Sequence, residues 1–340
     1  MNRSRIEYVD HTWNPITGCR HDCPYCYARR MAARFAGDVR LNKMAKADYQ
    51  LVNAGDGSAA VYRLEKPMMN ETGNSLVYPF GFEPTYHMYR MDMLDKLKMG
   101  NNIFVGAMAD MFGSWVPDEW IREILDVCMK YPIHNYLFLT KNPRRYGQVL
   151  VPTLKKNMWY GTSVTRETEI SRLSHLPAFC NTFVSIEPLL EDIYPEKNKE
   201  LIKNVEWIII GAETGQIIGK VIPSWEWIEK IVLIADDLGI PVFMKNSLIP
   251  IVGEENMRRD YPEELQKKEI SVKMEKKIYG ICDSCKSHMP KREMIALCAR
   301  YKRGEHPKQF AFMCKSCFMK FCEGLEVEVL PLVERKEGDM

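Results

Sequence analysis

The sequence contains no hydrophobic run that approaches the ~18 residues of a membrane span, which excludes a chain built around transmembrane helices. It also contains no internal repeat and no low-complexity tract, and its first residues are polar, without a signal-peptide core. Hydrophobic residues make up 46% and charged residues 27%, as is typical of a globular chain. We therefore expect a soluble, cytoplasmic protein with no membrane partner.

The net charge is also small, at +2, but the charges are unevenly distributed. Residues 266–340 hold 16 Lys and Arg against 11 Asp and Glu, whereas the remainder holds 31 against 34. Between Lys276 and Lys320 the balance is 11 against 3. A basic segment of this kind favours a polyanionic partner, although an ordinary solvated surface would have a similar composition.

The first cysteine cluster lacks a fourth thiol. Cys19, Cys23 and Cys26 have the spacing C-x3-C-x2-C. A structural zinc site takes four ligands, whereas a four-iron cluster held by three cysteines keeps one iron open for a substrate or cofactor. The spacing therefore favours a [4Fe–4S] cluster, with zinc and a distant fourth ligand, or structural thiols, as the alternatives. Eleven cysteines, seven of them in three short clusters, indicate metal ligation in a reducing compartment.

At this motif the chain resembles the radical S-adenosylmethionine (radical SAM) superfamily. C-x3-C-x2-C is the signature of that superfamily, and an aromatic residue before the third cysteine, here Tyr25, is usual. The string from Thr12 to Ala28 resembles a phage- and bacteria-associated branch of poorly defined function. Further matching segments are SIEPLL at 185–190, IGAETG at 210–215 and RDYP at 259–262. The resemblance extends over about residues 5–265.

From residue 100 onward, short apolar strands alternate with amphipathic helices. The predicted strands are residues 103–108, 136–140, 158–162, 183–186, 207–210 and 241–245, and the predicted helices are residues 118–130, 165–176 and 224–238. This alternation indicates a parallel sheet flanked by helices. We predict an α/β fold with an open or partial barrel, and the resemblance implies the partial (β/α)6 barrel of radical SAM enzymes.

Two segments depart from this pattern. Residues 37–100 are rich in turn residues and then in aromatics, and we interpret them as an insertion that is either a substrate-facing lid or a packed loop. Residues 266–280 are rich in lysine and poor in apolar residues, which indicates a charged linker. The predicted organisation is a barrel over residues 1–265, this linker, and a small module over residues 281–340.

Polar residues follow the predicted strands at six successive strand ends. They are Asp110, Thr140, Lys141, Thr162, Ser163, Ser185, Glu187, Glu213, Lys245 and Asn246. In parallel α/β sheets, functional side chains gather at the carboxyl ends of the strands. A single residue of this kind is as readily a helix cap or a solvated loop residue, but the recurrence predicts a site.

The resemblance implies the chemistry of that site. Cys19, Cys23 and Cys26 would hold a [4Fe–4S] cluster that binds S-adenosylmethionine, and reduction by an external donor such as a flavodoxin or ferredoxin would yield a 5′-deoxyadenosyl radical. Tyr25 would lie near the adenine. The cofactor performs the difficult chemistry, while the protein positions it and excludes water.

A second missing feature concerns the methionine amino group of the cofactor. Many superfamily members bind this group with a Gly-Gly-Glu stretch that ends the second strand. This chain has Ala107-Met108-Ala109-Asp110 in that place. We therefore expect Asp110 or backbone carbonyls to make the contact.

Five further residues are candidates for cofactor or substrate contacts. Ser163 is the candidate for a ribose or carboxylate contact, and Glu187 for a ribose or substrate contact. Glu213 follows two small residues that allow the backbone to approach a ligand closely. Lys141 and Lys245 are candidate partners for a carboxylate or phosphate, or else ordinary surface charges.

A second metal signal lies near the C-terminus. Cys282 with Cys285, and Cys314 with Cys317, form two C-x2-C knuckles, which are typical of a four-cysteine zinc ribbon. The 28 residues between the knuckles contain further cysteine and histidine residues that are spare ligands. A second iron–sulfur cluster is the rival interpretation.

Basic residues alternate with aromatic residues around these knuckles. They are Lys291, Arg292, Arg300, Tyr301, Lys302, Arg303, Lys308, Phe310 and Phe312. Such residues can contact phosphates and stack on bases, so DNA or RNA is the predicted partner of the module. A protein partner, or a purely stabilising role for the module, is the alternative.

Together these features predict a radical SAM enzyme that modifies or repairs a nucleic acid or a nucleotide-derived compound. Radical chemistry on a small metabolite or peptide is the alternative within the same class. The alternative from another class is a non-catalytic nucleic-acid-binding protein that uses the three cysteines as a redox sensor.

Overall fold

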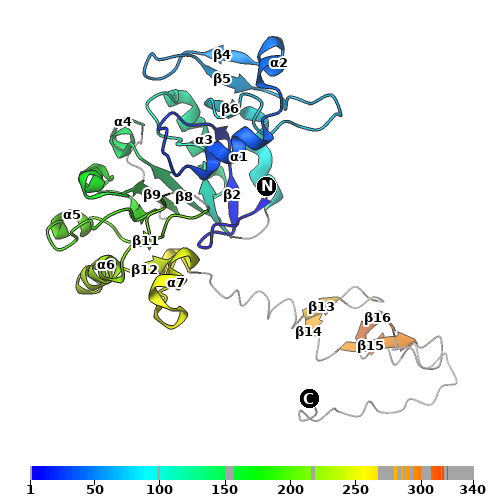
Figure 1. Cartoon of the computed structure of the whole chain (residues 1–340). Helices are drawn as coiled ribbons and strands as arrows, with labels where there is room; N and C mark the ends of the chain where they lie inside the picture. Colours follow the sequence, from blue (N-terminus) through cyan, green and yellow to red (C-terminus); the bar gives the residue numbers. More distant parts are fainter. Residues whose placement is uncertain are drawn as a thin grey trace. The chain divides into compact units, whose positions relative to one another are not determined.

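In the computed structural model the chain divides into two compact units, residues 1–266 and 267–340 (Figure 1). The described residues are 2–97, 100–149, 157–215 and 219–266 in the first unit, and 279–281, 285, 288–290, 294–299, 308–314, 316–317 and 320 in the second. Among them, no helix combines the length and the apolar composition needed to cross a membrane.

Seven parallel strands form a curled half-barrel sheet in the first unit. In spatial order they are β2 (His11–Trp13), β7 (Asn102–Val105), β8 (Asn135–Thr140), β9 (Met158–Ser163), β10 (Asn181–Ile186), β11 (Ile208–Ile210) and β12 (Val242–Met244). β1 (Asn2–Arg3) adds to the edge strand β2 in antiparallel orientation. The predicted α/β fold with a partial barrel is confirmed at this level.

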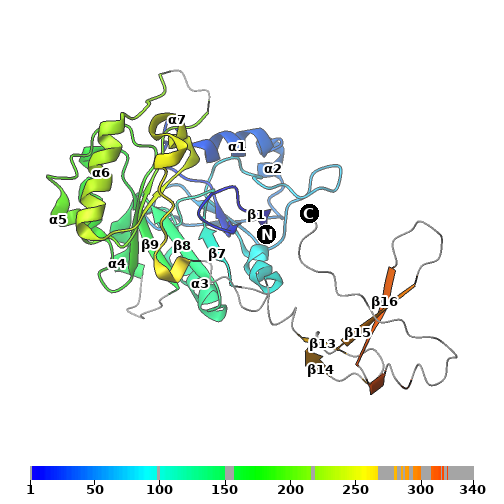
Figure 2. The same cartoon turned by 90° about the horizontal axis from the view of Figure 1, so that it is seen from below.

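Helices cover the outer face of this sheet (Figures 1 and 2). The two long ones are α3 (Asp118–Lys130) and α6 (Trp225–Leu238). The chain after β7 also contains the shorter helices η2 (Pro143–Arg145), α4 (Tyr146–Val149), η3 (Glu167–His175), α5 (Lys199–Ile202), η4 (Asn246–Leu248), α7 (Ile249–Val252), η5 (Glu254–Asn256) and η6 (Glu263–Leu265). α3 has the predicted bounds and buries the predicted apolar residues, including Trp120 and Ile124.

The ends of α6 also follow the sequence. The Ser224 hydroxyl accepts a hydrogen bond from the backbone amide of Trp227 at 3.4 Å, as expected of an N-cap. Gly239 ends the helix with φ +68°, in the left-handed region that glycine adopts without a steric penalty.

The predicted helix over residues 165–176 is wrong in type. The segment forms the 3-10 helix η3 instead. Both the backbone amide and the hydroxyl of Thr165 donate to the carboxylate of Glu169, at 2.7 and 2.9 Å. The residue at the N-cap of η3 is Arg166, whose side chain makes no capping hydrogen bond. The apolar residues Ile170 and Leu173 still face the core, because a 3-10 helix places residues i and i+3 on one side.

The face of the sheet opposite the helices is filled by large side chains from successive strands. Phe104, Leu137, Trp159, Phe183 and Phe243 belong to one buried cluster. This packing closes the interior of the half-barrel, so the space for a ligand lies at the strand ends rather than inside the sheet.

The predicted insertion builds a second sheet. Its order is β3 (Ile16–Thr17), β6 (Thr85–His87), β5 (Val61–Leu64) and β4 (Gln50–Val52), and it is accompanied by α1 (Tyr27–Phe35), α2 (Val39–Met44) and η1 (Met88–Lys96). β3 lies between β2 and the three cysteines, and it pairs with β6 of the insertion. The insertion therefore supports the cysteine-bearing segment directly, while its role as a lid or a packed loop stays a prediction.

The second unit contains two antiparallel strand pairs among its described residues. β13 (Tyr279–Ile281) pairs with β14 (His288–Pro290), and β15 (Met294–Ala299) pairs with β16 (Lys308–Cys314).

Candidate functional site at the carboxyl ends of the strands

The cysteine loop, residues 18–26, follows β3 and is held by backbone contacts from two sides. The Gly18 amide donates to the Met108 carbonyl at 2.9 Å, and the Cys19 amide donates to the Phe82 carbonyl at 3.1 Å. Gly18 has φ +88°, and a Cβ there would lie 2.3 Å from the carbonyl oxygen of Glu83. Only glycine fits this position, which brings the loop between the end of β7 and the insertion.

The loop leads directly into α1. The Cys26 thiol lies at the N-cap position and accepts a hydrogen bond from the Arg29 amide at 3.4 Å. The next residue, Tyr27, donates its hydroxyl hydrogen bond to the Ala107 carbonyl at 2.9 Å. α1 is therefore joined to the carboxyl end of β7 at its first residue.

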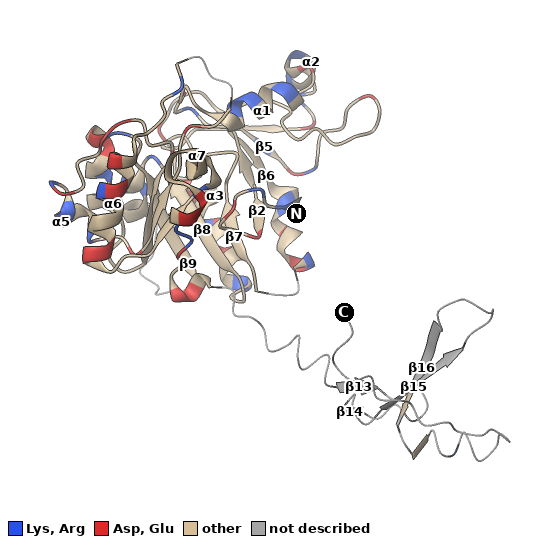
Figure 3. Ribbon diagram, turned by 60° about the horizontal axis from the view of Figure 1, so that its bottom comes forward, with Lys and Arg blue, Asp and Glu red and all other residues tan. Residues whose placement is uncertain are grey.

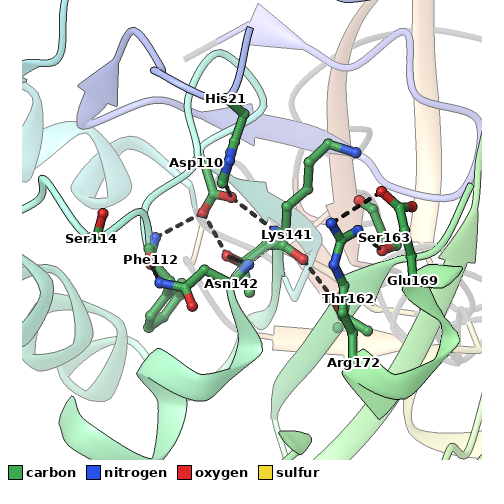
Figure 4. Close-up of polar contacts among 12 residues, drawn as sticks. His21, Asp110, Phe112, Ser114, Lys141, Asn142, Thr162, Ser163, Glu169 and Arg172 are labelled. Carbon is green, nitrogen blue, oxygen red and sulfur yellow. Dashed lines mark hydrogen bonds and ion pairs between the residues drawn. The ribbon is translucent and has the colours of Figure 1, made fainter. Parts of the chain in front are cut away.

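Asp110 is the centre of a hydrogen-bond network beneath the loop (Figure 4). Its carboxylate contacts His21 Nε2 at 2.7 Å and accepts from the Thr140 hydroxyl at 2.7 Å. It also accepts from the backbone amides of Phe112 at 3.0 Å and Lys141 at 2.9 Å. Burial opposes ionisation of Asp110, but the contacts with His21 and these donors outweigh it and lower the pKa of the carboxyl group.

Asp110 therefore joins three elements: the cysteine loop, the end of β7 and the end of β8. Its two carboxylate oxygens already have four hydrogen-bond partners. This geometry supports a positioning role for Asp110, and a direct contact with a cofactor amino group stays a prediction.

Lys141 reaches back from the end of β8 to the loop. Its Nζ donates to the Tyr25 hydroxyl at 2.7 Å and lies 5.1 Å from the centre of the Tyr25 ring. Burial alone would lower the pKa of Lys141, but the Tyr25 contact and the nearby Cys23 thiol raise it. The structure thus brings together Lys141 and Tyr25, two residues that the sequence predicted separately.

The three thiols are partly buried in this setting. Burial raises the pKa of Cys19 to about 12, with a further contribution from the Asp110 charge. Burial also raises the pKa of Cys23. A thiolate here needs a compensating positive charge, which a bound iron centre would supply.

Glu187 and Lys245 form an ion pair across the ends of β10 and β12. Gly211, at the end of the intervening strand β11, makes room for it. A Cβ on Gly211 would lie 3.0 Å from Cγ of Glu187 and 3.2 Å from Cδ of Lys245. Both side chains are less than a quarter exposed, so the pair lies at the rim of the strand ends rather than on the open surface.

Ser163 and Glu213 are two further polar residues at or after the ends of strands of this sheet. Ser163 is buried at the end of β9, and its carbonyl accepts a hydrogen bond from Arg172 at 2.9 Å (Figure 4). Glu213 is also buried and accepts from the Val221 amide at 3.2 Å.

Several residues at this edge were not predicted from the sequence. They are His21, Tyr27, Glu169 and Arg172. His21 lies inside the cysteine motif, so its position signalled proximity to the site. Its pairing with Asp110, 89 residues away, depends on the path of the loop and could not be anticipated.

The predicted zinc ligands fall largely outside the described part of the chain. Cys282 and the side chain of Cys314 are outside the described residues, while Cys285 is exposed and Cys317 is partly buried. Within the described part, no three His, Cys, Asp or Glu side chains are arranged to hold a single metal ion. The zinc ribbon stays a prediction.

Comparison with known proteins identifies a family. The family model described as "Protein of unknown function (DUF5131)" matches residues 3–272. No curated protein matches the chain.

Two similar solved structures are of spore photoproduct lyase. A mutant with dinucleoside spore photoproduct is 8% identical, with a TM-score of 0.40. A double mutant with bound AdoMet and dinucleoside spore photoproduct is 6% identical, with a TM-score of 0.39. In both cases the match covers 95% of this chain and 73% of that chain.

Proposed function

The chain belongs to the DUF5131 family, and we propose that it is a radical SAM enzyme whose [4Fe–4S] cluster is held by Cys19, Cys23 and Cys26. The observation that carries this proposal is the position of the three cysteines. They lie on one loop at the carboxyl end of a curled parallel sheet, and Gly18 and His21 join that loop to the end of β7.

The donor set of the loop fits such a cluster. Each of the three thiols would bind a different iron of such a cluster, so the thiols need not converge on a single point. The imidazole of His21, which could also bind a metal, is engaged with Asp110. When bound, the cluster supplies the electron that cleaves S-adenosylmethionine to a 5′-deoxyadenosyl radical.

The residues of this chain would bind and orient the cofactor. Asp110 and His21 hold the loop, and Lys141 presents a partly buried positive charge beside Tyr25 and Cys23. A cation in that place suits a carboxylate or an electron-rich ring. α1 lies against the strand ends through the contact of Tyr27 with the Ala107 carbonyl, and this limits the access of water.

Residues at the ends of the following strands would contact the rest of the cofactor or the substrate. Ser163 and Glu213 are buried polar residues there, and Glu187 and Lys245 are paired at the rim. Residues with hydroxyl or carboxylate oxygens are suited to ribose hydroxyl groups, and the lysine to a carboxylate or phosphate.

The substrate that we propose is a nucleic acid or a nucleotide-derived compound. The basic segment from Lys276 to Lys320, with 11 positive residues against 3 negative ones, supports this class. We further propose that Cys282, Cys285, Cys314 and Cys317 hold zinc in that module.

The decisive experiment is cofactor cleavage. Protein reconstituted with iron and sulfide without oxygen, then reduced with dithionite, should convert S-adenosylmethionine to 5′-deoxyadenosine and methionine. The variants Cys19→Ala, Cys23→Ala and Cys26→Ala should each abolish the product, whereas Cys180→Ala, outside the loop, should retain it. An equal rate in the loop variants and the wild type would reject the proposal.

A further inference from the structure

We infer that the exposed face of α1 and α2 binds a single-stranded nucleic acid and leads it to the strand ends. The inference rests on the proposed function and deepens it, because it assigns substrate binding to the first unit itself. We call this surface the arginine face and define it by Tyr27, Arg30, Met31, Arg34 and Phe35 of α1 with Arg40 and Lys43 of α2.

The spacing of these residues on α1 makes one continuous stripe. Tyr27, Arg30, Met31 and Arg34 are separated by three or four residues, so they are neighbours on a helix. Ala28 and Ala32 lie on the other side and are buried against Tyr78 and Met108. The short alanine side chains hold α1 close to the protein, and the longer cationic and apolar side chains face outward.

Large apolar side chains are exposed along this stripe. Tyr27 is 50% exposed, Met31 42% and Phe35 48%. They alternate with cations instead of forming one apolar patch, and the Arg34 guanidinium lies 5.3 Å from the centre of the Phe35 ring. Proteins that bind single-stranded nucleic acids combine flat side chains, which stack on the bases, with positive charges, which contact the phosphates.

The charge of the arginine face is strongly one-sided. Residues 27–46 hold six Lys and Arg and one acidic residue, Asp38. The Asp38 carboxylate already accepts hydrogen bonds from the amides of Arg40 at 2.9 Å and Leu41 at 3.3 Å at the start of α2. Among the ion pairs found between described residues, none involves Arg30, Arg34, Arg40 or Lys43.

The opposite charge prevails elsewhere on the same unit. Residues 1–265 carry 31 positive against 34 negative residues, so the arginine face stands out from an acidic background. α6 holds Glu226, Glu229, Asp236 and Asp237 against Lys230. Figure 3 shows the blue segments on α1 and α2 and the red segments on α6. A polyanion would therefore be attracted to α1 and α2 and repelled from α6.

The arginine face also adjoins the candidate site. Tyr27 contacts the Ala107 carbonyl at the end of β7. A guanidinium nitrogen of Arg30 lies 3.7 Å from the position that a Cβ on Gly215 would occupy, in the loop after β11. The first turn of α1 thus has one residue at the end of β7 and another near the loop after β11. A strand bound along it would have its bases beside the cysteine loop.

Binding of a labelled single-stranded oligonucleotide of mixed sequence to the full-length protein tests this inference. The triple variant Arg34→Gln, Arg40→Gln, Lys43→Gln should bind about 10-fold more weakly than the wild type. The slope of log affinity against log salt concentration should fall by about 2, because each lost phosphate contact removes roughly 0.7 for a single strand. A triple variant of equal charge change, Lys96→Gln, Arg122→Gln, Lys130→Gln, should keep the wild-type affinity and slope.

Unchanged binding by the arginine-face variant would overturn the inference. If that variant also lost its reduction by an acidic flavodoxin, the surface would be assigned to a protein partner instead. Cleavage of S-adenosylmethionine without nucleic acid is measured on the same variants. No cleavage by the wild type would contradict the proposed function. Cleavage at the wild-type rate by the arginine-face variant, together with its weaker oligonucleotide binding, would support the surface independently of the cluster.

Discussion

The side chain of His21 contacts the carboxylate of Asp110 at 2.7 Å, although the two residues are 89 positions apart in the sequence. His21 lies between the first two cysteines of the loop, and Asp110 lies buried just beyond the end of β7. The contact therefore fixes the loop against the sheet. Through Asp110 it also connects the loop to Thr140 and to the Lys141 backbone at the end of β8.

Replacing Asp110 should loosen the loop. In Asp110→Asn the amide nitrogen would face several donors, and the buried charge that His21 contacts would be lost. We expect the free energy of unfolding to fall by about 2–3 kcal/mol, the usual loss for hydrogen bonds to a charged group. We also expect fewer irons per chain after reconstitution.

Urea denaturation and iron analysis check this prediction, with the exposed Asp48→Asn as the control. A variant as stable and as iron-rich as the wild type would show that the contact does not hold the loop.

Two glycines with positive φ provide a matched test of the loop's packing. Gly18 has φ +88° and Gly57 has φ +71°. A Cβ on Gly18 would lie 2.3 Å from the backbone oxygen of Glu83, whereas a Cβ on Gly57 would have no atom within 4 Å. Gly57→Ala should cost about 1 kcal/mol of stability from its backbone conformation alone. Gly18→Ala should cost at least about 3 kcal/mol. Equal losses, measured by urea denaturation, would argue against the close approach at Gly18.

The ion pair of Glu187 and Lys245 should be energetically coupled. Both side chains are mostly shielded from solvent, so removing one leaves the other without its partner at the rim of the site. A double-mutant cycle with Glu187→Gln and Lys245→Met should give a coupling energy of about 1–2 kcal/mol in the free energy of unfolding. The predicted coupling requires the two single losses to sum to more than the loss in the double variant, and simple additivity would contradict it.

A buried histidine behind the cysteine loop should make stability depend on pH. His87 is fully buried, contacts the Thr17 hydroxyl at 2.8 Å and the Tyr89 hydroxyl at 3.1 Å, and has a pKa well below its usual range, chiefly because burial disfavours its charged form. The unfolded chain binds the proton at a pKa of about 6.5. Stability linked to His87 is therefore fully present above about pH 6.5 and decreases as the pH falls below it, by up to ~1.4 kcal/mol per pH unit.

The His87→Gln variant should lack this decrease, because glutamine does not titrate. Urea denaturation at pH 7.5, 6.5 and 5.5 compares it with the wild type, and the exposed His175→Gln should follow the wild type. Parallel pH profiles for wild type and His87→Gln would mean that His87 is not held neutral.

The fold was predictable where local patterns and general rules of parallel sheets coincide. α3 combined acidic residues at its start with an apolar stripe, and α6 had a serine cap and a terminal glycine, so their bounds followed from the sequence. η3 was mistaken for an α-helix because Ile170 and Leu173 satisfy both helix types. The hydrogen bonds from Thr165 to the Glu169 side chain, just before and within η3, leave no periodic signal in the sequence.

The location of the site, at the carboxyl ends of the strands, could be predicted from the sequence, but the contacts between its residues could not. Polar residues after each strand had to meet there, because parallel strands end on the same side of a sheet. Which of them pair depends on the loops, and neither the contact of Lys141 with Tyr25 nor that of His21 with Asp110 leaves a periodic signal. The second sheet was also unpredicted, since β3 has only two residues and pairs with a segment that begins at Thr85.

The most direct test of the account is the metal content of the cysteine loop. Full-length protein purified without oxygen should contain about four irons and four acid-labile sulfides per chain beyond any zinc, and the variant Cys19→Ala, Cys23→Ala, Cys26→Ala should lose both while Cys128→Ala keeps them. Wild-type protein that contains neither iron nor sulfide after reconstitution, or a triple variant that retains them, would contradict the central claim that these three thiols hold a cluster.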